Sequence, residues 1–204
     1  MKILLIHGLG RTPLSMSGLA AALQLAGHET ELFGYMAWLH SFDDIARRLR
    51  DRLQSLSIAG NYGVVSHSLG SILVRAALAK TAFPQPACVV MLAPPNQSPR
   101  LGRWASRLLP YQLFSKQCGA NLASSDFYNC LSPLTCPYTI IAGTAGIVGP
   151  MSPFGYEAND MIVGLEETKM QPSDRPLEVR AFHSFIMNNP EVQKLTVDAF
   201  AEAT

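Results

Sequence analysis

The chain has 204 residues, of which 48% are hydrophobic and 15% are charged, and its formal net charge is +1. This composition excludes a disordered chain, and the near balance of basic and acidic side chains gives no reason to expect nucleic acid as a partner. A chain of this length can bury a substantial apolar core by itself, so we expect a single domain over residues 1–204.

Strand patterns and helix patterns alternate along the chain. Apolar segments predict strands at 2–6, 30–33, 62–65, 87–92, 137–142 and 177–181. Helical patterns are opened by Thr12-Pro13, by Ser41 and by Asn189-Pro190, and a further one covers 71–82. Strands that alternate with helices predict an α/β fold, in which a parallel sheet has helices on both faces.

Two of the helical patterns have a clear apolar face. In the first helix, which ends at Gly27, the residues expected to point inward are Leu14, Leu19, Leu23 and Ala26. The helix capped by Ser41 has an apolar face of Ile45, Leu49, Leu53 and Leu56, and arginines of the 47–52 stretch cover its solvated face. From 94 to 136 the pattern loosens around several prolines, with an amphipathic piece over 101–109.

The location of the protein is predicted from its apolar segments and its cysteines. The apolar run of the first strand stops at His7-Gly8, too early for a signal peptide, and no segment is long enough to cross a membrane. No two cysteines have the C-x-x-C spacing of a zinc or redox site, so no metal is expected. A disulfide among Cys118, Cys130 and Cys136 stays open, but we favour reduced thiols in a cytoplasmic protein.

Polar residues follow four of the predicted strands. His7-Gly8-Leu9-Gly10 follows the first, Ser68 the third, and Asp160 and His183 come after the last two. The carboxyl ends of parallel strands are where functional groups gather, and Ser, Asp, His is the chain order of one known class of catalytic triads. Ser66-His67-Ser68-Leu69-Gly70 also places small residues two before and two after the serine, as a tight strand-to-helix turn requires.

The predicted roles follow from acid–base chemistry. Ser68 is the candidate nucleophile, His183 the base that takes its proton, and Asp160 the carboxylate that orients the histidine. The rival acids are Glu157, Asp174 in a turn that reads as exposed, and the pair Glu166-Glu167, which reads as surface charge.

The oxyanion formed by attack of Ser68 needs N–H donors. The expected donors are the backbone groups of Leu69, next to the nucleophile, and of Leu9 in the loop after the first strand. A dinucleotide fingerprint is excluded because Arg11-Thr12-Pro13 supplies no third glycine, so no cofactor is expected. His7 is expected to order this loop by hydrogen bonding, and it is also a tentative substrate-binding residue.

These motifs together resemble the α/β-hydrolase superfamily, in particular its small bacterial lipase-like or esterase-like members. The matching segments surround Gly8, Ser68, Pro94-Pro95, Asp160 and His183, and they span nearly the whole chain. The resemblance implies an α/β-hydrolase fold, the triad Ser68–Asp160–His183, and the oxyanion donors Leu9 and Leu69. Asp160-Met161-Ile162-Val163 is similar to the Asp-Gly-x-Val turn of lipase-like relatives, with Met in place of Gly.

The resemblance also assigns a role to residues 94–136, which fall where such enzymes insert a cap or lid. An apolar face with Leu101 and Trp104 would line an acyl pocket, and Tyr111 and Phe114 are further tentative substrate-binding residues. The alternative is an ordinary surface helix packed on the core.

The sequence therefore predicts a serine hydrolase that cleaves a carboxylic ester through an acyl-enzyme on Ser68. Its expected partner is a small-molecule acyl ester. The alternatives are an acyltransferase, a thioesterase or amidase with the same triad, and a non-catalytic binding protein. The oligomeric state has no sequence signal.

Overall fold

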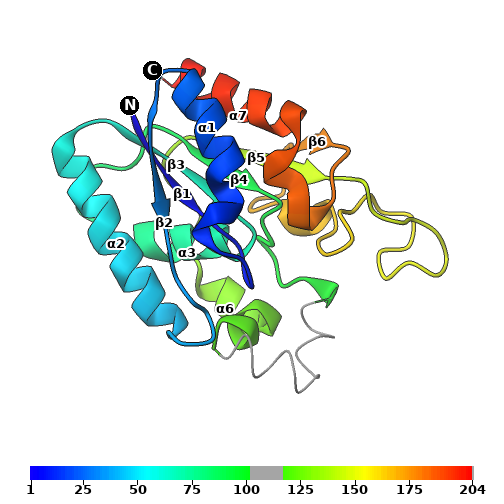
Figure 1. Ribbon diagram of the computed structural model, residues 1–204. Coiled ribbons are helices and arrows are strands. Elements are labelled where there is room, and N and C mark those ends of the chain that lie inside the picture. The colour runs from blue at the N-terminus through cyan, green and yellow to red at the C-terminus, as the bar shows by residue number, and fades with distance from the viewer. Residues whose placement is uncertain (102–116, 204) are drawn as a thin grey trace.

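One parallel sheet of six strands runs through the computed structural model, which describes residues 1–101 and 117–203 (Figure 1). The strands are β1 (Lys2–Ile6), β2 (Glu29–Phe33), β3 (Tyr62–His67), β4 (Val89–Leu92), β5 (Tyr138–Gly143) and β6 (Leu177–Val179). Their order across the sheet is β2-β1-β3-β4-β5-β6, and neighbouring strands are parallel. The predicted α/β fold with a parallel sheet is therefore confirmed.

Helices cover both faces of this sheet. Leu4 and Ile6 of β1 point toward α2 (Phe42–Ala59) and α3 (Leu69–Leu78). Ile3 and Leu5 point the other way, toward α1 (Ser17–Leu25) and α7 (Pro190–Glu202). Because alternate residues of a strand face opposite sides, one short apolar segment serves two cores. The short elements are η1 (Pro13–Met16), α6 (Ser125–Cys130), η2 (Glu166–Thr168) and η3 (His183–Asn188).

Two predicted helix caps are present. The Asp44 N–H donates to Ser41 Oγ at 3.1 Å, and the Glu191 N–H donates to Asn189 Oδ1 at 2.8 Å. Each bond satisfies one of the N–H groups that the first turn of a helix leaves unpaired. The predicted apolar face of α2 is buried as well.

The prediction for the first helix was partly wrong. Pro13–Met16 forms a separate 3₁₀ turn, and the α-helix starts only at Ser17. Thr12 precedes that turn, but its side chain makes no capping hydrogen bond. The tighter turn breaks the helical period, so Leu14 lies in solvent rather than beside Leu19, and Ala26, just past the last turn, is also exposed.

The helix predicted over 71–82 is displaced toward the N-terminus. It begins at Leu69, directly after Ser68, and it ends at Leu78. Ala79 is extended and Lys80 has φ of 54°, so the helical path stops there. The consequence for the site is that the first N–H groups of α3 lie next to the candidate nucleophile.

The insertion over 94–136 is only partly described. Residues 117–123 are helical, and Cys118, Leu122 and Leu134 are buried in the core that contains α2 and α3. This half of the insertion therefore packs on the body of the protein. The predicted amphipathic piece beyond Leu101 lies outside the described residues.

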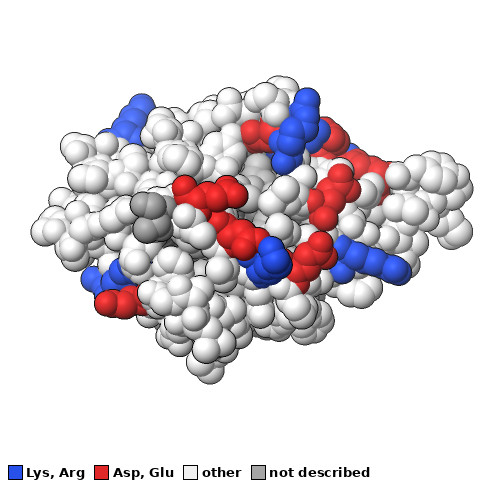
Figure 2. Space-filling view, turned by 90° about the horizontal axis from the view of Figure 1, so that it is seen from above, with Lys and Arg blue, Asp and Glu red and all other residues white. Residues whose placement is uncertain are grey.

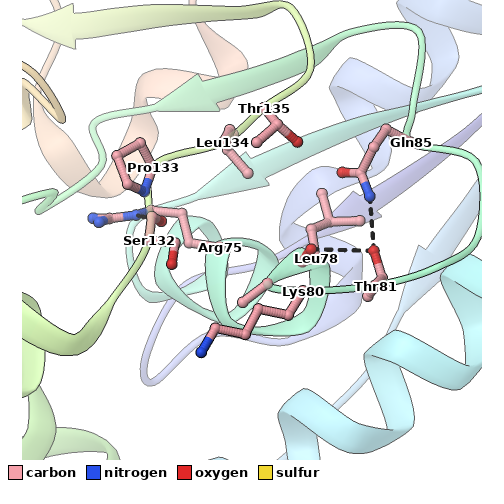
Figure 3. A pocket seen from close by; sticks show the side chains of 10 residues that line it. Arg75, Leu78, Lys80, Thr81, Gln85, Ser132, Pro133, Leu134 and Thr135 are labelled. Carbon is pink, nitrogen blue, oxygen red and sulfur yellow. Dashed lines mark hydrogen bonds between the residues drawn. The ribbon is translucent and has the colours of Figure 1, made fainter.

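Buried Arg75 joins both ends of the insertion to α3. Its guanidinium donates to the carbonyl oxygens of Asn96 at 3.1 Å, Leu131 at 3.0 Å and Ser132 at 3.4 Å. Arg75 also lines a cavity of about 300 Å³ with Leu78 of the same helix (Figure 3). Arg75 thus ties residue 96 and residues 131–132, near the two ends of the insertion, to the same helix.

Candidate active site

Ser68 occupies the sharp turn between β3 and α3. Its φ and ψ are 52° and −122°, a region that residues other than glycine rarely adopt and that costs about 1–3 kcal/mol. The Ser68 N–H donates to Leu92 O of the neighbouring strand at 3.0 Å, which holds the strained residue in place. The turn therefore lifts the hydroxyl above the carboxyl edge of the sheet.

The residues two before and two after Ser68 are small for different reasons. A Cβ on Gly70 would lie 2.8 Å from His7 O and 2.9 Å from Ile6 O, so the start of α3 touches the end of β1. Ser66 is fully buried, and its Oγ lies 2.9 Å from Ser71 Oγ. The hydroxyl at position 66 is accommodated because it has a hydrogen-bond partner on the helix.

The loop after β1 lies directly against this turn. A Cβ on Gly8 would be 2.7 Å from His67 Nδ1 and 3.0 Å from Ser68 Cβ, so only glycine fits without displacement. Leu9 follows Gly8 in this loop. Leu69 is the first residue of α3, and its N–H has no acceptor within its own helix. The two predicted oxyanion donors thus belong to segments that meet at Ser68.

His7 orders this loop, as the sequence predicts. Its Nδ1–H donates to Gly8 O at 2.9 Å, its Nε2 accepts from the Tyr35 N–H at 3.4 Å, and its ring stacks on Tyr35 with centroids 4.2 Å apart. The Tyr35 hydroxyl donates to His7 O at 2.8 Å. Burial lowers the pKa of His7, so the ring stays neutral near pH 7. Both of its nitrogens already have protein partners.

Ser68, His183 and Asp160 lie in one hydrogen-bonded chain. The Ser68 hydroxyl donates to His183 Nε2 across 2.9 Å, and His183 Nδ1–H donates to Asp160 Oδ2 across 2.7 Å. All three residues are nearly buried, at 9%, 8% and 1% exposure. A base within hydrogen-bond reach of a hydroxyl, oriented by a carboxylate, is the arrangement that activates a serine.

The turn that carries Asp160 prepares its carboxylate for this contact. Asp160 Oδ1 accepts from the N–H groups of Ile162 at 2.9 Å and Val163 at 2.7 Å. These bonds replace the water lost on burial and leave Oδ2 directed at His183. Met161 has φ of 83°, the left-handed conformation for which glycine is best suited.

The backbone of His183 is held from both turns. Its N–H donates to Asp160 O at 3.0 Å, and its carbonyl accepts from His67 Nε2 at 3.0 Å. Burial, together with the nearby His183, lowers the pKa of His67 well below its usual value, so this ring stays neutral. His183 thus receives one backbone and one side-chain contact from each turn.

The rival carboxylates have structural partners. Asp174 accepts from the Tyr138 hydroxyl at 2.7 Å and from the Met170 N–H at 2.8 Å. Glu157 accepts from the Glu166 N–H at 2.9 Å and forms an ion pair with Arg100. None of these four contacts reaches His183.

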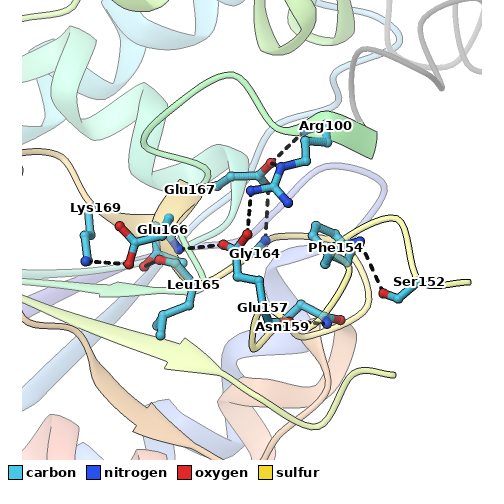
Figure 4. Close-up of polar contacts among 11 residues, drawn as sticks. Arg100, Ser152, Phe154, Glu157, Asn159, Gly164, Leu165, Glu166, Glu167 and Lys169 are labelled. Atoms are coloured by element: carbon cyan, nitrogen blue, oxygen red, sulfur yellow. Dashed lines mark hydrogen bonds and ion pairs between the residues drawn. The ribbon is translucent and has the colours of Figure 1, made fainter. Parts of the chain in front are cut away.

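The prediction that Glu166-Glu167 is surface charge was wrong for Glu167. Glu167 is 5% exposed, accepts from the N–H groups of Gly164 and Arg100, each at 2.9 Å, and lies 3.2 Å from the Arg100 guanidinium (Figure 4). Such buried charges are stable only when paired and hydrogen-bonded. The Arg100–Glu167 pair therefore links the turn that contains Asp160 to the start of the insertion.

Several contacts of the site have no local sequence signal. The Ser66–Ser71 bond joins β3 to α3 across the Ser68 turn, whereas the bond from His67 to the His183 carbonyl and the Arg100–Glu167 pair join residues far apart in the sequence. Only the small size of Ser66 and the polarity of His67 inside an apolar segment pointed toward them.

Other predictions for the site concern residues outside the described part of the chain. Trp104, Tyr111 and Phe114 are among them. Within residues 1–101 and 117–203, no cluster of His, Cys, Asp and Glu could hold a metal ion, and no helix could cross a membrane. All four cysteines are free thiols, so the disulfide left open by the sequence is not formed.

Solved structures resemble this chain at low sequence identity. Phospholipase PlaB from Legionella pneumophila is 16% identical with a TM-score of 0.61, over 83% of this chain and 46% of that one. An extracellular α/β-hydrolase from a Paenibacillus species is 15% identical with a TM-score of 0.62, over 100% and 98%. The RedJ thioesterase of prodiginine biosynthesis in Streptomyces coelicolor is 13% identical with a TM-score of 0.60, over 100% and 90%.

No protein-family model and no curated protein sequence matches the chain. The relation to known proteins therefore rests on architecture. The chain spans less than half of the Legionella protein but nearly all of the other two. A parallel sheet in this order, with similarity to solved α/β-hydrolases over the full chain, identifies the fold of this protein as the α/β-hydrolase fold.

Proposed function

We propose that this protein is a serine hydrolase that cleaves a carboxylic ester through an acyl-enzyme on Ser68. The observation that carries the proposal is the chain of two hydrogen bonds from Ser68 Oγ through His183 to Asp160, at 2.9 Å and 2.7 Å. Spacing of this kind lets proton transfer accompany attack without rearrangement of the side chains.

In the proposed reaction, Ser68 Oγ attacks the ester carbonyl while His183 Nε2 takes the hydroxyl proton. Asp160 stabilises the imidazolium that forms. The backbone N–H groups of Leu9 and Leu69 donate to the oxyanion, and the N-terminal end of α3 adds a favourable partial charge.

Collapse of the intermediate breaks the ester bond, and His183 returns its proton to the departing alcohol. Water then attacks the acyl-enzyme with His183 as base, which releases the acid and restores the Ser68 hydroxyl. No step requires a cofactor.

The proposal also covers the surroundings of this reaction. The substrate is a small-molecule acyl ester, and residues 94–136 act as a cap over the site. Four free thiols support a reducing compartment, so we place the protein in the cytoplasm.

The test is labelling by a fluorophosphonate probe, followed by hydrolysis of p-nitrophenyl esters of increasing chain length. We expect labelling at Ser68, and Ser68→Ala is expected to lower turnover by roughly 10³–10⁶ with the fold retained. Ser55→Ala, on the surface of α2, is the matched control and keeps full activity. An unlabelled wild-type protein would indicate a non-catalytic binding protein and overturn the proposal.

The other reactions of the same triad are separated by product analysis. An acyltransferase would convert added alcohol or amine acceptors to acylated products faster than it releases acid. A thioesterase or amidase would turn over a thioester or anilide faster than the matched oxygen ester. Either result would replace the ester assignment while leaving Ser68 as nucleophile.

A further inference from the structure

Exposed apolar side chains are concentrated on one edge of the molecule. Among the described residues, fifteen large apolar side chains are exposed, and twelve of them lie in segments that follow β1, β2, β5 and β6. In a parallel sheet these segments all leave from the carboxyl edge. The other three are Leu25, Ile58 and Leu177, at the ends of α1 and α2 and at the start of β6, hence at the opposite edge.

The loop after β5 contributes most to this edge. From residue 144 to residue 156 it contains no Lys, Arg, His, Asp or Glu. Met151 is 99% exposed, Tyr156 79% and Ile147 67%. The loop projects from the body at the right of Figure 1, and the corresponding lobe in Figure 2 is free of charged residues. Single exposed apolar residues are common, but a contiguous set marks an interaction surface.

The first residues of this loop are hydrogen-bonded to the segments that carry the candidate acid and base. The Ala145 N–H donates to Ala181 O at 3.2 Å, two residues before His183. The Gly146 N–H donates to Asn159 O at 2.7 Å, and Asn159 precedes Asp160. The apolar loop is therefore built onto the same backbone that positions the acid and the base.

Further exposed apolar side chains flank the site directly. Phe182 and Phe185, on either side of His183, are 53% and 61% exposed. Arg11 donates to Ser184 O, and its guanidinium lies 5.5 Å from the centre of the Phe185 ring. The positive charge of Arg11 is therefore already in contact with protein groups on this side of the site.

The position of the surface decides which partner fits. A permanent protein partner on this edge would cover Ser68 and stop turnover. If this edge instead docks on an aggregate of the substrate, the surface that covers Ser68 also supplies the ester. The uncharged loop also matches the apolar interior of a lipid layer rather than a charged partner.

We propose that this edge docks on the surface of an acyl-lipid aggregate, such as a bilayer, with the loop over 144–156 inserted, and that the ester attacked by Ser68 belongs to a lipid of that surface. The ester part rests on the proposed function, whereas docking does not require a reaction.

Docking is tested with the Ser68→Ala protein and phosphatidylcholine vesicles in a flotation assay. We expect binding that changes little between 50 mM and 500 mM salt, because the inserted loop is uncharged. Val148 of the loop is exposed like Met151, and the double variant Val148→Asp/Met151→Asp is expected to lower vesicle affinity at least about tenfold. The matched control Leu25→Asp/Ile58→Asp, at the opposite edge, is expected to bind as before.

Three results would overturn docking: no flotation with vesicles, an equal loss in the control pair, or an apolar edge covered by a second copy of the chain. The last would appear in sedimentation as a dimer that the Val148→Asp/Met151→Asp change dissociates.

The lipid-ester part is tested by the ratio of two rates in the protein with Ser68 intact. One is the rate on a short, soluble p-nitrophenyl ester, and the other is the rate on a fluorogenic acyl ester embedded in the same vesicles. We expect the loop pair to lower the ratio of embedded to soluble rates about tenfold, in line with its affinity. An unchanged ratio would overturn this part. Vesicle binding without fluorophosphonate labelling would overturn the proposed function and leave docking standing.

Discussion

The two turns that hold His183 solve the same problem by different means. Each contains one non-glycine residue at positive φ, Ser68 at 52° and Met161 at 83°. At Ser68 the strained residue is itself the candidate nucleophile, so the conformation aims the reacting atom. At Met161 the strained residue only follows the reacting one, and its side chain is 42% exposed. We therefore expect the strained conformation to matter for activity in the first turn and to be dispensable in the second.

The two turns are also braced differently. The Ser68 turn is locked by backbone contact, because Gly70 lies against the carbonyls of His7 and Ile6. The Asp160 turn is locked by charged side chains, through Glu167 and its partner Arg100. We therefore expect the first turn to be sensitive to added volume and the second to changes of hydrogen bonding.

The largest expected effect concerns the contact between the Asp160 turn and His183. Asp160→Asn keeps an acceptor for the Ile162 and Val163 N–H groups but loses the charge that orients His183. We expect the kcat on a nitrophenyl ester to fall by about 10³–10⁴ with little change in Tm. A loss below tenfold would mean that another carboxylate orients His183. Asp174→Asn is the matched control and is expected to keep near-normal turnover.

Added volume tests the bracing of the Ser68 turn. Gly70→Ala forces a Cβ to within 2.9 Å of two backbone oxygens, and we expect it to lower the free energy of unfolding by about 1–3 kcal/mol and to reduce kcat. Gly18→Ala in α1 is the control, because its Cβ would meet Asn188 Oδ1 at an ordinary 3.4 Å. The control should be neutral or stabilise by about 0.5–1 kcal/mol in urea unfolding. Equal effects of the two changes would show that the turn tolerates volume.

His67 joins the Ser68 turn to the backbone of His183, and its substitution tests whether this contact positions the histidine. His67→Phe removes the donor to the His183 carbonyl, and we expect kcat to fall about tenfold or more while KM changes little. His67→Gln restores an N–H donor and should recover part of that loss. An equal fall of kcat in both variants would show that the loss does not come from this hydrogen bond.

The same residue gives a pH signature. Because burial holds the pKa of folded His67 well below its usual value of 6.5, the unfolded chain binds a proton there that the folded chain does not. Stability from this group is present above about pH 6.5 and is lost as pH falls toward the folded pKa. Between pH 6.5 and 5, His67→Gln should reduce the slope of the unfolding free energy by up to about 1.4 kcal/mol per pH unit. An unchanged slope would contradict a neutral, buried His67.

The smallest effect is expected where strain is dispensable. Met161→Gly relieves a positive φ that costs a side-chain residue about 1–2 kcal/mol, but it adds freedom to the unfolded chain. We expect a net gain of up to about 1 kcal/mol in the free energy of unfolding, with kcat within about twofold of wild type. Lys80→Gly, at φ of 54° after α3, is the matched case and should gain a similar amount. A large loss of activity in Met161→Gly would show that this side chain helps to hold Asp160.

The sequence predicted the sheet well because its strands are short apolar runs with clear ends. It also predicted which serine, aspartate and histidine would meet, because each follows a strand and parallel strands end at one edge. It failed where geometry overrides pattern. The start of α3 was placed two residues late, since a residue at positive φ can directly precede a helix. Glu167 was read as surface charge because its partner Arg100 is distant in sequence.

Arg75 has a consequence for how this protein can vary. Its guanidinium bonds Asn96 and Leu131, so residues near the two ends of the insertion are held close together beside α3. The entropy lost on closing a loop rises only slowly with its length. A change of length between residues 101 and 117 would then leave the Arg75 contacts, the Arg100–Glu167 pair and the buried Cys118 and Leu122 in place. The length of this segment can therefore vary, in evolution or in design, while the contacts that hold Ser68 and Asp160 stay the same.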